Sequence, residues 1–518
     1  MSRSLIFAGL ILGSSTSLSA QAVTSPPPNL DRFVEQVMHD FEVPGLALTV
    51  VKDGRVVVAR GYGVRALGRP EPVDGHTLFG IASNTKAFTA TALGLLVEEG
   101  KIAWDVPVIT YLPWFRLSNP FVTAEITVRD LLVHRSGLGL GAGDLLWWPS
   151  STYNRKEIAQ RLQFIPLSTS FRSAYAYDNV LYLIAGELIE AVSGLSWEDF
   201  VRTRILAKVG MTESNVRHSD ATASGNVATP HASVDGAVRP IKPFDSDNTN
   251  PAGGINSNAT DMAKWLMVQL DSGAVKGGER LFSARTTRQL WSIVTPIPVG
   301  GNPPELSLLT PNFHGYALGF DIRDYRGRMV VAHTGGLPGY VSRVIMVPSL
   351  NLGVAVLTNQ ETAAMEPIAL TILDHYMNAS YDWNRAFKTV VARADSATHE
   401  GDAAAASSRD SATGPSLSLA KYAGTYTDRW YGDVTISQEG ERLVIRFSHT
   451  PSLVGDLVHW QQDTFLARWR DRELRADAFV TFALTPDGHI DEVKMKPASP
   501  SVDFSFDFQD LLLKPSRK

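Results

Sequence analysis

The hydrophobic pattern of the chain changes once, between residues 393 and 416, and this change divides the fold into two parts. The stretch Asp402–Pro415 consists mainly of alanine, serine and polar residues with no apolar period, which is typical of a linker. The part before it mixes helical and strand patterns, whereas the part after it alternates with period two. Because 518 residues exceed one ordinary domain, we predict one domain over 28–392, a flexible linker over 393–416 and a second domain over 417–518.

The second domain is predicted to be a small antiparallel β-barrel or sheet. Turn signals occur at Glu439-Gly440 and at Pro486-Asp487-Gly488, as expected between antiparallel strands. Apolar residues recur at every second position, so that each set faces one side of a strand. The sets are Val434/Ile436, Leu443/Ile445/Phe447, Phe479/Thr481/Ala483 and Phe504/Phe506/Phe508.

The first domain is predicted to combine a sheet with many helices. A Lys52-Asp53-Gly54 turn joins two strand-like runs, 46–51 and 56–59, into a hairpin. Further strands are expected over 330–333, 341–347 and 354–357. Apolar residues at helical spacing indicate helices over 30–41, 84–99, 127–133, 179–193 and 258–270.

Residues 1–22 have the pattern of a secretory signal peptide. Arg3 supplies the positive start, Leu5–Leu12 is a short apolar run, and Ala20-Gln21-Ala22 is a small-x-small cleavage site. An ordinary flexible terminus is the alternative. A membrane anchor needs about 18 apolar residues, and no segment of the chain approaches that length. We therefore expect a periplasmic or secreted protein with no stable membrane anchor.

The composition and the absence of common motifs exclude several chemistries. The chain has no cysteine, which rules out disulfides, thiol catalysis, thiolate metal sites and a lipid anchor on cysteine. The formal net charge of −5 argues against a nucleic-acid partner, which favours a basic face. The sequence also lacks a Gly-x-Ser-x-Gly elbow, a phosphate-binding loop, a His-Glu-x-x-His zinc helix and an EF-hand loop. No cofactor and no metal are therefore predicted.

The first candidate catalytic motif is Ser83-Asn84-Thr85-Lys86. Spacing of three residues at a helix start places the hydroxyl and the amine on one face. A serine at a helix N-terminus has a free N–H and a favourable dipole for developing negative charge, and a buried lysine loses proton affinity and can act as a base. The pattern also arises by chance, as Ser418-Leu419-Ala420-Lys421 shows. A helix-capping serine beside a solvated lysine is the alternative.

Two further motifs could complete a site with Ser83. Tyr177-Asp178-Asn179 precedes a predicted helix, where a tyrosinate or tyrosine could relay a proton and Asn179 could bond a substrate amide. The alternative is a core tyrosine and a helix-capping asparagine. His333-Thr334-Gly335-Gly336 follows a strand run, and the Gly336 N–H could complete an oxyanion hole with the serine N–H. A plain strand-end turn is the alternative there.

In this order and spacing, these motifs resemble the serine β-lactamase and penicillin-recognising hydrolase superfamily. The likeness is greatest to class C β-lactamases, D-aminopeptidases and related esterases, and it covers about residues 30–380. Other matching segments are Val43-Pro44-Gly45-Leu46-Ala47, Gly61-Tyr62-Gly63, Thr77-Leu78-Phe79, residues 96–101, Thr127 to His134 with Ser136-Gly137-Leu138, and Pro251-Ala252-Gly253-Gly254. The C-terminal sheet resembles the lipocalin-like domain found on some exported members.

The resemblance implies a role for each motif. Ser83 would be the nucleophile, Lys86 the general base, and Tyr177 the shuttle that carries a proton to the leaving group. Asn179 would orient the substrate amide, and residues 333–336 would line the opposite wall. The implied fold is α/β (α+β), with an antiparallel sheet flanked by helices beside an all-helical lobe, and with the site between them.

His333 departs from the commonest form of the superfamily, in which lysine stands at this position. Lysine gives a permanent charge for a substrate carboxylate, whereas histidine is only partly charged near neutral pH. This argues against β-lactam specificity and favours peptides, amides or esters. Trp147-Trp148-Pro149 either forms an apolar rim of the cleft or simply packs a loop.

We therefore expect an exported serine hydrolase that cleaves amide bonds of small or linear peptides through an acyl-enzyme on Ser83. An esterase or a β-lactamase that uses the same site is one alternative. A penicillin-binding sensor that is acylated without turnover is another, although no transmembrane signalling segment remains after the signal peptide. The expected partner is a small molecule or peptide substrate, and the sequence does not determine the oligomeric state.

Overall fold

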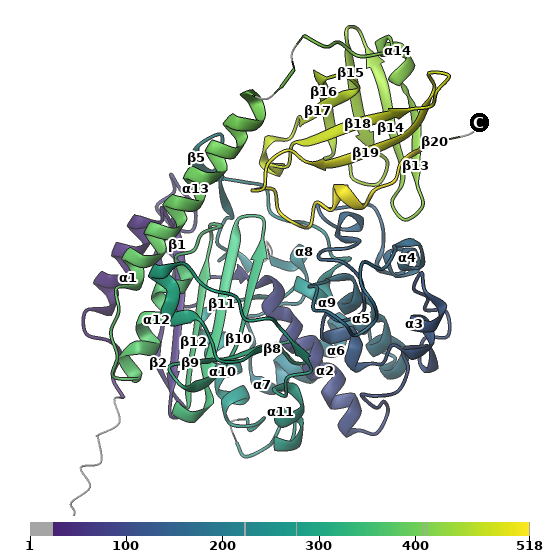
Figure 1. The fold of residues 1–518 in the computed structure, drawn as a ribbon. Coiled ribbons are helices and arrows are strands. Elements are labelled where there is room, and N and C mark those ends of the chain that lie inside the picture. The colour runs from purple at the N-terminus through teal and green to yellow at the C-terminus, as the bar shows by residue number, and fades with distance from the viewer. Residues whose placement is uncertain (1–23, 222–223, 276, 408, 411, 517–518) are drawn as a thin grey trace, which may run out of the picture.

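The computed structural model describes residues 24–221, 224–275, 277–407, 409–410 and 412–516. It contains a large antiparallel sheet flanked by helices, and a smaller antiparallel barrel formed by the C-terminal residues (Figure 1). The predicted fold class is therefore confirmed. The predicted signal peptide, 1–22, lies outside the described residues, and export stays a prediction. Among the described residues no single helix has the length and hydropathy to cross a membrane, although Val180–Ser193 and Trp197–Val209 pass that test together as a bent pair.

The sheet of the first domain pairs the beginning of the domain with its end. The predicted hairpin forms, and its first strand also pairs with the last strand in antiparallel register, with Leu46 opposite Thr358. These two strands are buried along their whole length, because helices cover both faces of the sheet there. The spatial order is β2 (Arg55–Gly63), β1 (Gly45–Lys52), β12 (Leu352–Thr358), β11 (Tyr340–Val347), β10 (Arg328–Leu337), β9 (Asp321–Tyr325), β8 (His314–Tyr316) and β7 (Thr295–Pro296).

Alternating residues of β1 face two separate hydrophobic cores. Leu46 and Leu48 pack into the core on one face, whereas Ala47 packs into the core on the other. The period of two in a strand accounts for this division. The helices that cover the sheet are α1 (Leu30–Asp40) and α12 (Met365–Tyr376) on the first face, and α2 (Lys86–Glu98) and α10 (Ala259–Leu270) on the second.

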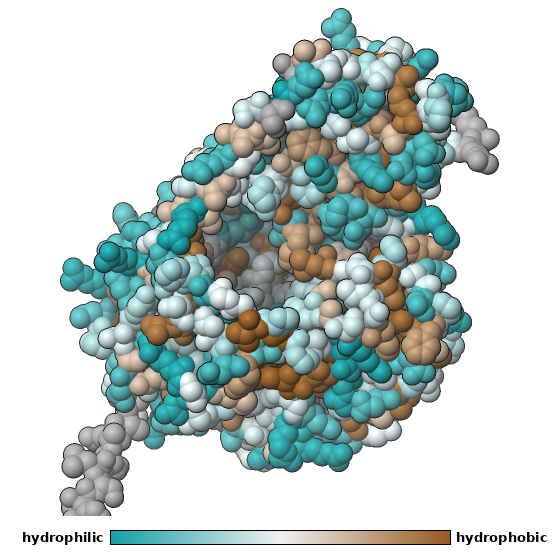
Figure 2. Space-filling model, in the orientation of Figure 1, coloured by the Kyte–Doolittle hydropathy of each residue, from teal (hydrophilic) through white to brown (hydrophobic). Residues whose placement is uncertain are grey.

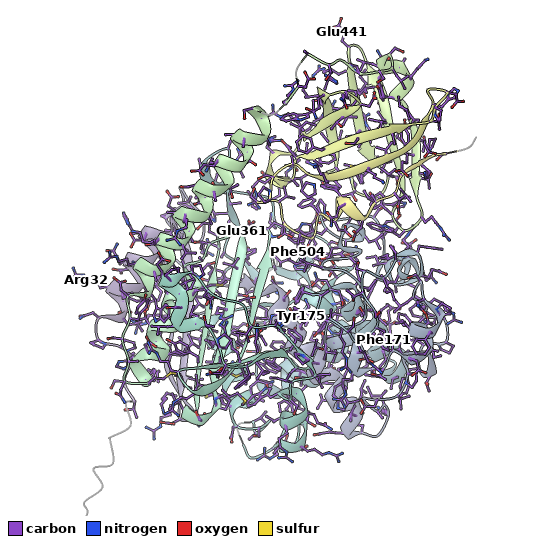
Figure 3. The ribbon with its side chains drawn as sticks, viewed as in Figure 1. Arg32, Phe171, Tyr175, Glu361, Glu441 and Phe504 are labelled. Carbon is purple, nitrogen blue, oxygen red and sulfur yellow. The ribbon has the colours of Figure 1, made fainter. Side chains whose placement is uncertain are left out.

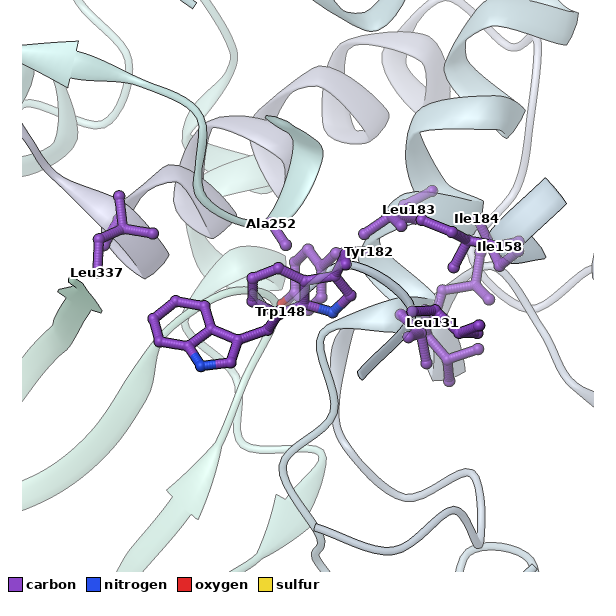
Figure 4. Packing of buried hydrophobic residues seen from close by; sticks show 14 of the residues in the cluster. Leu131, Trp148, Ile158, Tyr182, Leu183, Ile184, Ala252 and Leu337 are labelled. Atoms are coloured by element: carbon purple, nitrogen blue, oxygen red, sulfur yellow. The ribbon is translucent and has the colours of Figure 1, made fainter. Parts of the chain in front are cut away.

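An all-helical lobe lies beside the sheet, as predicted (Figure 1). Its central helix, α5 (Val180–Ser193), is buried over most of its length. Figure 4 shows Leu183 and Ile184 of this helix beside Ile158 of α4 (Arg155–Arg161). A helix that is apolar on all sides needs partners on all sides, and α5 therefore fixes the lobe against α2.

The helix predicted over 127–133 is much shorter in the structure. The expected capping pair is present, because the Thr127 amide and hydroxyl both bond the Asp130 carboxylate, at 3.0 and 2.7 Å. Only the 3₁₀ turn Arg129–Leu132 follows. His134 has a φ of 56°, a left-handed conformation that cannot continue a helix. The prediction of the start was right, and the prediction of the length was wrong.

The segment predicted as a flexible linker is largely helical. α13 (Trp383–Ser407) runs through residues 393–407, so the linker prediction is wrong over this range. Alanine has the highest intrinsic helix propensity, and Ala403–Ala406 extends the helix although the segment has no apolar period. After the helix, the Arg409 guanidinium donates to the Trp460 backbone oxygen at 2.6 Å. This contact holds the segment against the barrel.

The C-terminal residues form a nearly closed antiparallel barrel. Each strand from β13 to β19 pairs with the next, and β20 pairs with β13. Backbone hydrogen bonds between Val493 and Leu513, at 2.9 and 3.3 Å, close most of the remaining gap. The strands are β13 (Gly424–Asp428), β14 (Gly432–Glu439), β15 (Arg442–Phe447), β16 (Val454–Gln461), β17 (Thr464–Trp469), β18 (Ala478–Leu484), β19 (Ile490–Pro497) and β20 (Lys514–Pro515).

The three phenylalanines expected on a last strand do not form one. They lie in the connection between β19 and β20, residues 498–513, which reaches the first domain and which we call the docking loop. Phe506 packs edge-on against Trp148 of the first domain, with ring centroids 6.4 Å apart, while Phe508 stays in the barrel core. Figure 3 shows Phe504 where the loop meets the first domain. The alternation therefore reflects contacts with two domains rather than one strand face.

Candidate active site

Ser83 lies on a tight turn that joins a short strand to α2. β3 (Phe79–Gly80) precedes the 3₁₀ turn Ala82–Thr85, and the α-helix begins only at Lys86, later than predicted. Ala82 has a φ of 49°, a left-handed conformation that is unfavourable for a residue with a Cβ. Ser83 is partly exposed, while the residues on both sides of it are buried. The strained turn therefore presents one hydroxyl at the start of a helix.

The Lys86 side chain is completely buried and makes three polar contacts. Its Nζ lies 2.9 Å from Ser83 Oγ, 2.7 Å from Asn179 Oδ1 and 3.2 Å from the Ala252 carbonyl oxygen. The asparagine and alanine oxygens can only accept hydrogen bonds, so they take the two hydrogens of a neutral amine. The lone pair of that amine then faces the serine hydroxyl. In this arrangement the amine can take the serine proton.

Burial lowers the pKa of Lys86 to about 7, because an ammonium is costly to remove from water. The carboxylates of Asp144 and Asp178 oppose this shift by favouring the charged form. Aromatic rings enclose the amine, which lies 4.9 Å from the ring centre of Tyr177 and 5.1 Å from that of Tyr182. Neutral amine is therefore abundant near neutral pH, as the sequence predicted for a buried lysine.

A chain of buried hydrogen bonds holds Lys86 from behind. Asn179 accepts from the lysine and donates through Nδ2 to the Asp144 carboxylate at 2.8 Å. Asp144 also accepts from the Trp147 indole at 2.9 Å and from the Ser505 hydroxyl at 3.0 Å. Burial raises the pKa of Asp144 to about 7. One amide hydrogen of Asn179 remains for a substrate carbonyl. The role of Asn179 in orienting the substrate stays a prediction.

Tyr177 faces Ser83 from the helical lobe. Its hydroxyl bonds the serine side chain, and burial raises its pKa well above the ordinary value of 10.0. The side chain is therefore a neutral phenol, which can donate a proton but does not act as a tyrosinate base. The ring of His134 lies against that of Tyr177, with centroids 4.3 Å apart, and its Nδ1 accepts a hydrogen bond from the Asp178 amide at 3.1 Å. The sequence had placed His134 only within a family motif.

His333 stands on the opposite wall, on β10, and it is neutral. The Tyr316 hydroxyl bonds its Nε2 at 2.7 Å, and its Nδ1 lies 2.5 Å from the Thr334 backbone oxygen. Burial, together with the nearby Lys86, lowers the pKa of His333 to about 3. The sequence indicated a partly charged histidine at this position. The structure shows that this wall carries no positive charge there.

The residues that follow the histidine have different surroundings. Thr334 and Gly336 are exposed and line the same pocket as Ser83, whereas Gly335 is buried. A Cβ on Gly335 would lie 2.3 Å from the Ile81 backbone oxygen, so only glycine lets β10 pass this close to the turn before the serine. A Cβ on Gly336 would meet no atom within 4 Å. Gly335 therefore sets the distance between β10 and the turn that carries Ser83. Gly336 borders the predicted oxyanion position.

The predicted residues meet around one pocket of about 290 Å³. Lys86 lies behind it, and Trp147 and Trp148 form an apolar wall, as one of the two sequence interpretations expected. Figure 4 shows Trp148 beside Leu337 of β10. Within the described part of the chain, no group of three or more histidine or carboxylate side chains is arranged to hold a metal ion. The predicted residues that line the pocket are Ser83, Tyr177, Asn179, His333, Thr334 and Gly336.

The docking loop completes the pocket from the C-terminal domain. The phenyl ring of Phe504 lies edge-on to Tyr177, with centroids 6.3 Å apart, and a Cβ on Gly141 would lie 2.7 Å from the same phenyl ring. Because 361 positions separate Ser505 from its partner Asp144, no local sequence pattern indicated this contact. Three loop residues line the pocket: Asp503, Phe504 and Ser505.

Asp507 anchors the docking loop to the first domain. Its completely buried carboxylate accepts hydrogen bonds from the backbone amides of Gly143, at 2.7 Å, and Leu145, at 3.0 Å. These two residues flank Asp144, which supports Lys86 through the asparagine. Burial, with the nearby Asp144 carboxylate, raises the pKa of Asp507 well above its usual value. The C-terminal domain therefore holds the segment that contains Asp144, which supports Lys86 through Asn179.

We expect Asp507→Ala to lower the free energy of unfolding by about 2 kcal/mol, because two buried amides lose their acceptor. Urea unfolding of the full chain, followed by tryptophan fluorescence, measures this change. Asp491→Ala, at an exposed position of β19, is the control and is expected to change stability by no more than about 0.5 kcal/mol. An Asp507→Ala protein as stable as the wild type would show that this carboxylate does not anchor the loop.

Comparison with known proteins assigns a family to each part of the chain. A family model described as beta-lactamase matches residues 30–376, which is more than half of the chain. The chain belongs to the beta-lactamase family. A second model, described as a domain of unknown function (DUF3471), matches residues 408–515, which contain the barrel and the docking loop. The predicted resemblance is confirmed, and a C-terminal barrel is present, while its likeness to lipocalins stays a prediction.

Relatives of this beta-lactamase-family chain include a named hydrolase. The unguisins hydrolase ungD' of Aspergillus campestris is 29% identical over 482 residues, covering 88% of this chain and 86% of that protein. The penicillin-binding protein homologue from Pyrococcus abyssi shares the fold with a TM-score of 0.58 at 21% identity, covering 94% of this chain and 99% of its own. The D-amino acid amidase from Ochrobactrum anthropi shares it with a TM-score of 0.55 at 23% identity, covering 68% and 98%. The protein is a serine hydrolase of the beta-lactamase family.

Proposed function

We propose that this serine hydrolase cleaves amide bonds of small or linear peptides, with Ser83 as the nucleophile. The observation that carries the proposal is the charge of the pocket. Its described lining contains no lysine or arginine and one carboxylate, Asp503, and His333 is neutral. A carboxylate on the leaving group would find no partner there, and burying it unpaired is costly. The pocket therefore favours an internal amide bond or a C-terminal amide over a free carboxylate or a β-lactam.

The reaction proceeds through an acyl-enzyme. Neutral Lys86 takes the proton of Ser83 while Oγ attacks the carbonyl carbon, and the backbone N–H groups of Ser83 and Gly336 stabilise the oxyanion. Tyr177 donates a proton to the leaving nitrogen as the C–N bond breaks, and Lys86 returns its proton to the phenolate. Water, deprotonated by the same lysine, then attacks the ester carbonyl. The C–Oγ bond breaks, Lys86 returns the proton to Oγ, and the acid is released.

One similar protein is named a hydrolase of unguisins, which supports hydrolysis in general. Another is a D-amino acid amidase, which supports amide cleavage. The signal-like residues 1–22 support export, so we place the substrates outside the cytoplasm. An esterase activity would use the same nucleophile, base and oxyanion position, and esters therefore belong in the substrate panel.

The test compares substrates that differ only at the leaving-group end. We expect kcat/KM to be at least about tenfold higher for peptides that end in an amide than for the same peptides with a free carboxylate, because the pocket offers no cation. Faster turnover of nitrocefin than of any peptide or amide would contradict the proposal. A β-lactam adduct that persists in mass spectra without turnover of any substrate would support the sensor instead.

His333→Lys is expected to raise the turnover of the carboxylate peptide relative to the amide peptide by about tenfold, because the ammonium supplies the missing charge. The same pair of substrates measures this ratio. His399→Lys adds the same charge on the exposed surface of α13, outside the pocket lining, and is expected to leave the ratio unchanged. A folded His333→Lys enzyme with the wild-type ratio would show that charge on this wall does not select substrates.

A further inference from the structure

A second cavity, of about 510 Å³, lies between the two domains and adjoins the Ser83 pocket. We call it the junction cavity. A volume of about 300–1,000 Å³ is typical of a ligand-binding site. Figure 2 shows the molecule hollowed at this junction, and Figure 3 labels Glu361, which lines the junction cavity, and Phe504, which lines the Ser83 pocket. The two cavities share four lining residues: Trp148, Gly336, Leu337 and Asp503.

Aromatic side chains from both domains form one wall of the junction cavity. Trp148 and Phe244 stack with ring centroids 5.7 Å apart and planes 28° apart. Phe506 of the docking loop meets Trp148 edge-on, and Leu337 of β10 continues the apolar surface. Such a wall suits an apolar or aromatic side chain of a ligand.

The rest of the lining carries an excess of negative charge. Arg475 forms a bidentate pair with Glu361, with both distances 2.7 Å, and Lys242 pairs with Asp471 at 3.0 Å. The remaining carboxylates have no hydrogen bond or ion pair with a cationic side chain in the described part of the chain. The charged lining residues are Asp245, Glu361, Asp471, Glu473 and Asp503 against Lys242 and Arg475.

Asp503 lies where the junction cavity meets the Ser83 pocket, and it lines both. Its carboxylate accepts a hydrogen bond from the Ser505 amide of its own loop at 2.8 Å. Solvent reaches the residue, yet the surrounding protein desolvates the carboxylate enough to raise its pKa. Glu361 adds to this rise, whereas hydrogen bonds from Ser505 and the charge of Arg475 oppose it. A carboxylate in this position is stabilised by a cation that a ligand brings.

We propose that the junction cavity binds the acyl-side part of the peptide substrate and that Asp503 selects a positively charged group on it. This inference rests on the proposed function. The proposed function places the leaving group beside His333 of β10. The acyl side would then run along β10 past Gly336 and Leu337, which line both cavities. An apolar side chain packs on Trp148. A lysine or arginine side chain, or the peptide amino terminus, pairs with the carboxylate.

The test measures kcat/KM of the full chain for peptide amides that differ at one acyl-side residue, which is lysine, norleucine or glutamate. Free-amine and N-acetylated versions of each peptide separate the amino terminus from the side chain as the source of the charge. Where the side chain supplies the charge, we expect the N-acetylated lysine peptide to exceed the N-acetylated glutamate peptide by about tenfold, with norleucine between them. Where the amino terminus supplies it, we expect each free-amine peptide to exceed its N-acetylated version by about tenfold. Equal values for all six peptides would overturn the inference.

Asp503→Asn is expected to remove this preference. The ratio of kcat/KM for the positively charged peptide to that for the N-acetylated norleucine peptide falls by about tenfold. Asp487→Asn makes the same charge change in the exposed turn between β18 and β19 and is expected to keep the preference. A preference that survives Asp503→Asn would also overturn the inference.

The outcomes distinguish this inference from the proposed function. Cleavage that is lost in Ser83→Ala but shows no charge preference would overturn the role of Asp503 and leave the proposed function standing. Peptide cleavage that persists undiminished in Ser83→Ala, or that is absent from the wild type, would overturn both.

Discussion

Ser83→Ala is expected to lower kcat/KM for every substrate that the enzyme cleaves by about 10⁴-fold or more, because no acyl-enzyme can form without the hydroxyl. The side chain that it removes is partly exposed and sits on a preformed turn, so the fold is expected to stay intact. Steady-state kinetics on esters and peptide amides measures the loss. Intact-mass spectrometry with a slowly turned-over ester is expected to show an adduct on the wild type and none on the variant.

The chain supplies a matched control for this substitution. Ser418 and Lys421 repeat the spacing of the candidate pair, but they lie at the start of α14 (Leu419–Tyr422) in the barrel. Ser418→Ala is expected to keep wild-type turnover, because the pocket contains neither residue. Wild-type turnover in Ser83→Ala would exclude this serine as the nucleophile and, with it, the proposed mechanism.

The activity of the wild type is expected to rise with pH through an apparent pKa of about 7, the value to which burial lowers the pKa of Lys86. Below this pH the ammonium has no lone pair and cannot accept the serine proton, and above it the neutral amine can. The pKa of Tyr177 lies well above 10.0, so its ionisation causes no fall in activity up to about pH 9. The pH dependence of kcat/KM for an uncharged substrate measures this profile.

Lys86→Met is expected to lower kcat/KM by about 10³-fold or more and to remove the rise near pH 7, because the base and its titration disappear together. Lys421→Met is the control and is expected to retain both activity and profile. A rise near pH 7 that persists in Lys86→Met would assign the titration to another group. Asp144 is then the alternative, since burial also raises its pKa to about 7, and Asp144→Asn distinguishes the two.

Much of the fold could be predicted because strands and helices leave local periods in a sequence. The hairpin of β1 and β2, the helix α5 and three barrel strands, β14, β15 and β18, have the expected positions. The errors have local causes as well. Alanine continued α13 through residues 393–407 without an apolar period, and the alternating phenylalanines of the docking loop followed contacts with two domains instead of one strand.

The candidate site was predictable where it depends on spacing along the chain. Ser83 and Lys86 lie three positions apart at a helix start, and their atoms meet at 2.9 Å. Tyr177 precedes α5 and faces the same serine. The support of the lysine was not predictable, because Asp144 reaches it through an asparagine that lies 35 positions further along the chain.

By itself the sequence determined the family, the two-part organisation and the residue types that surround the candidate nucleophile, because these follow from hydrophobic period and motif spacing. Only the tertiary structure decided that His333 is uncharged and that the docking loop completes the pocket with Asp503 and Ser505. Burial sets whether a group is charged, and burial arises only when distant segments pack. The contact between Ser505 and Asp144 exists only after both domains have folded and docked.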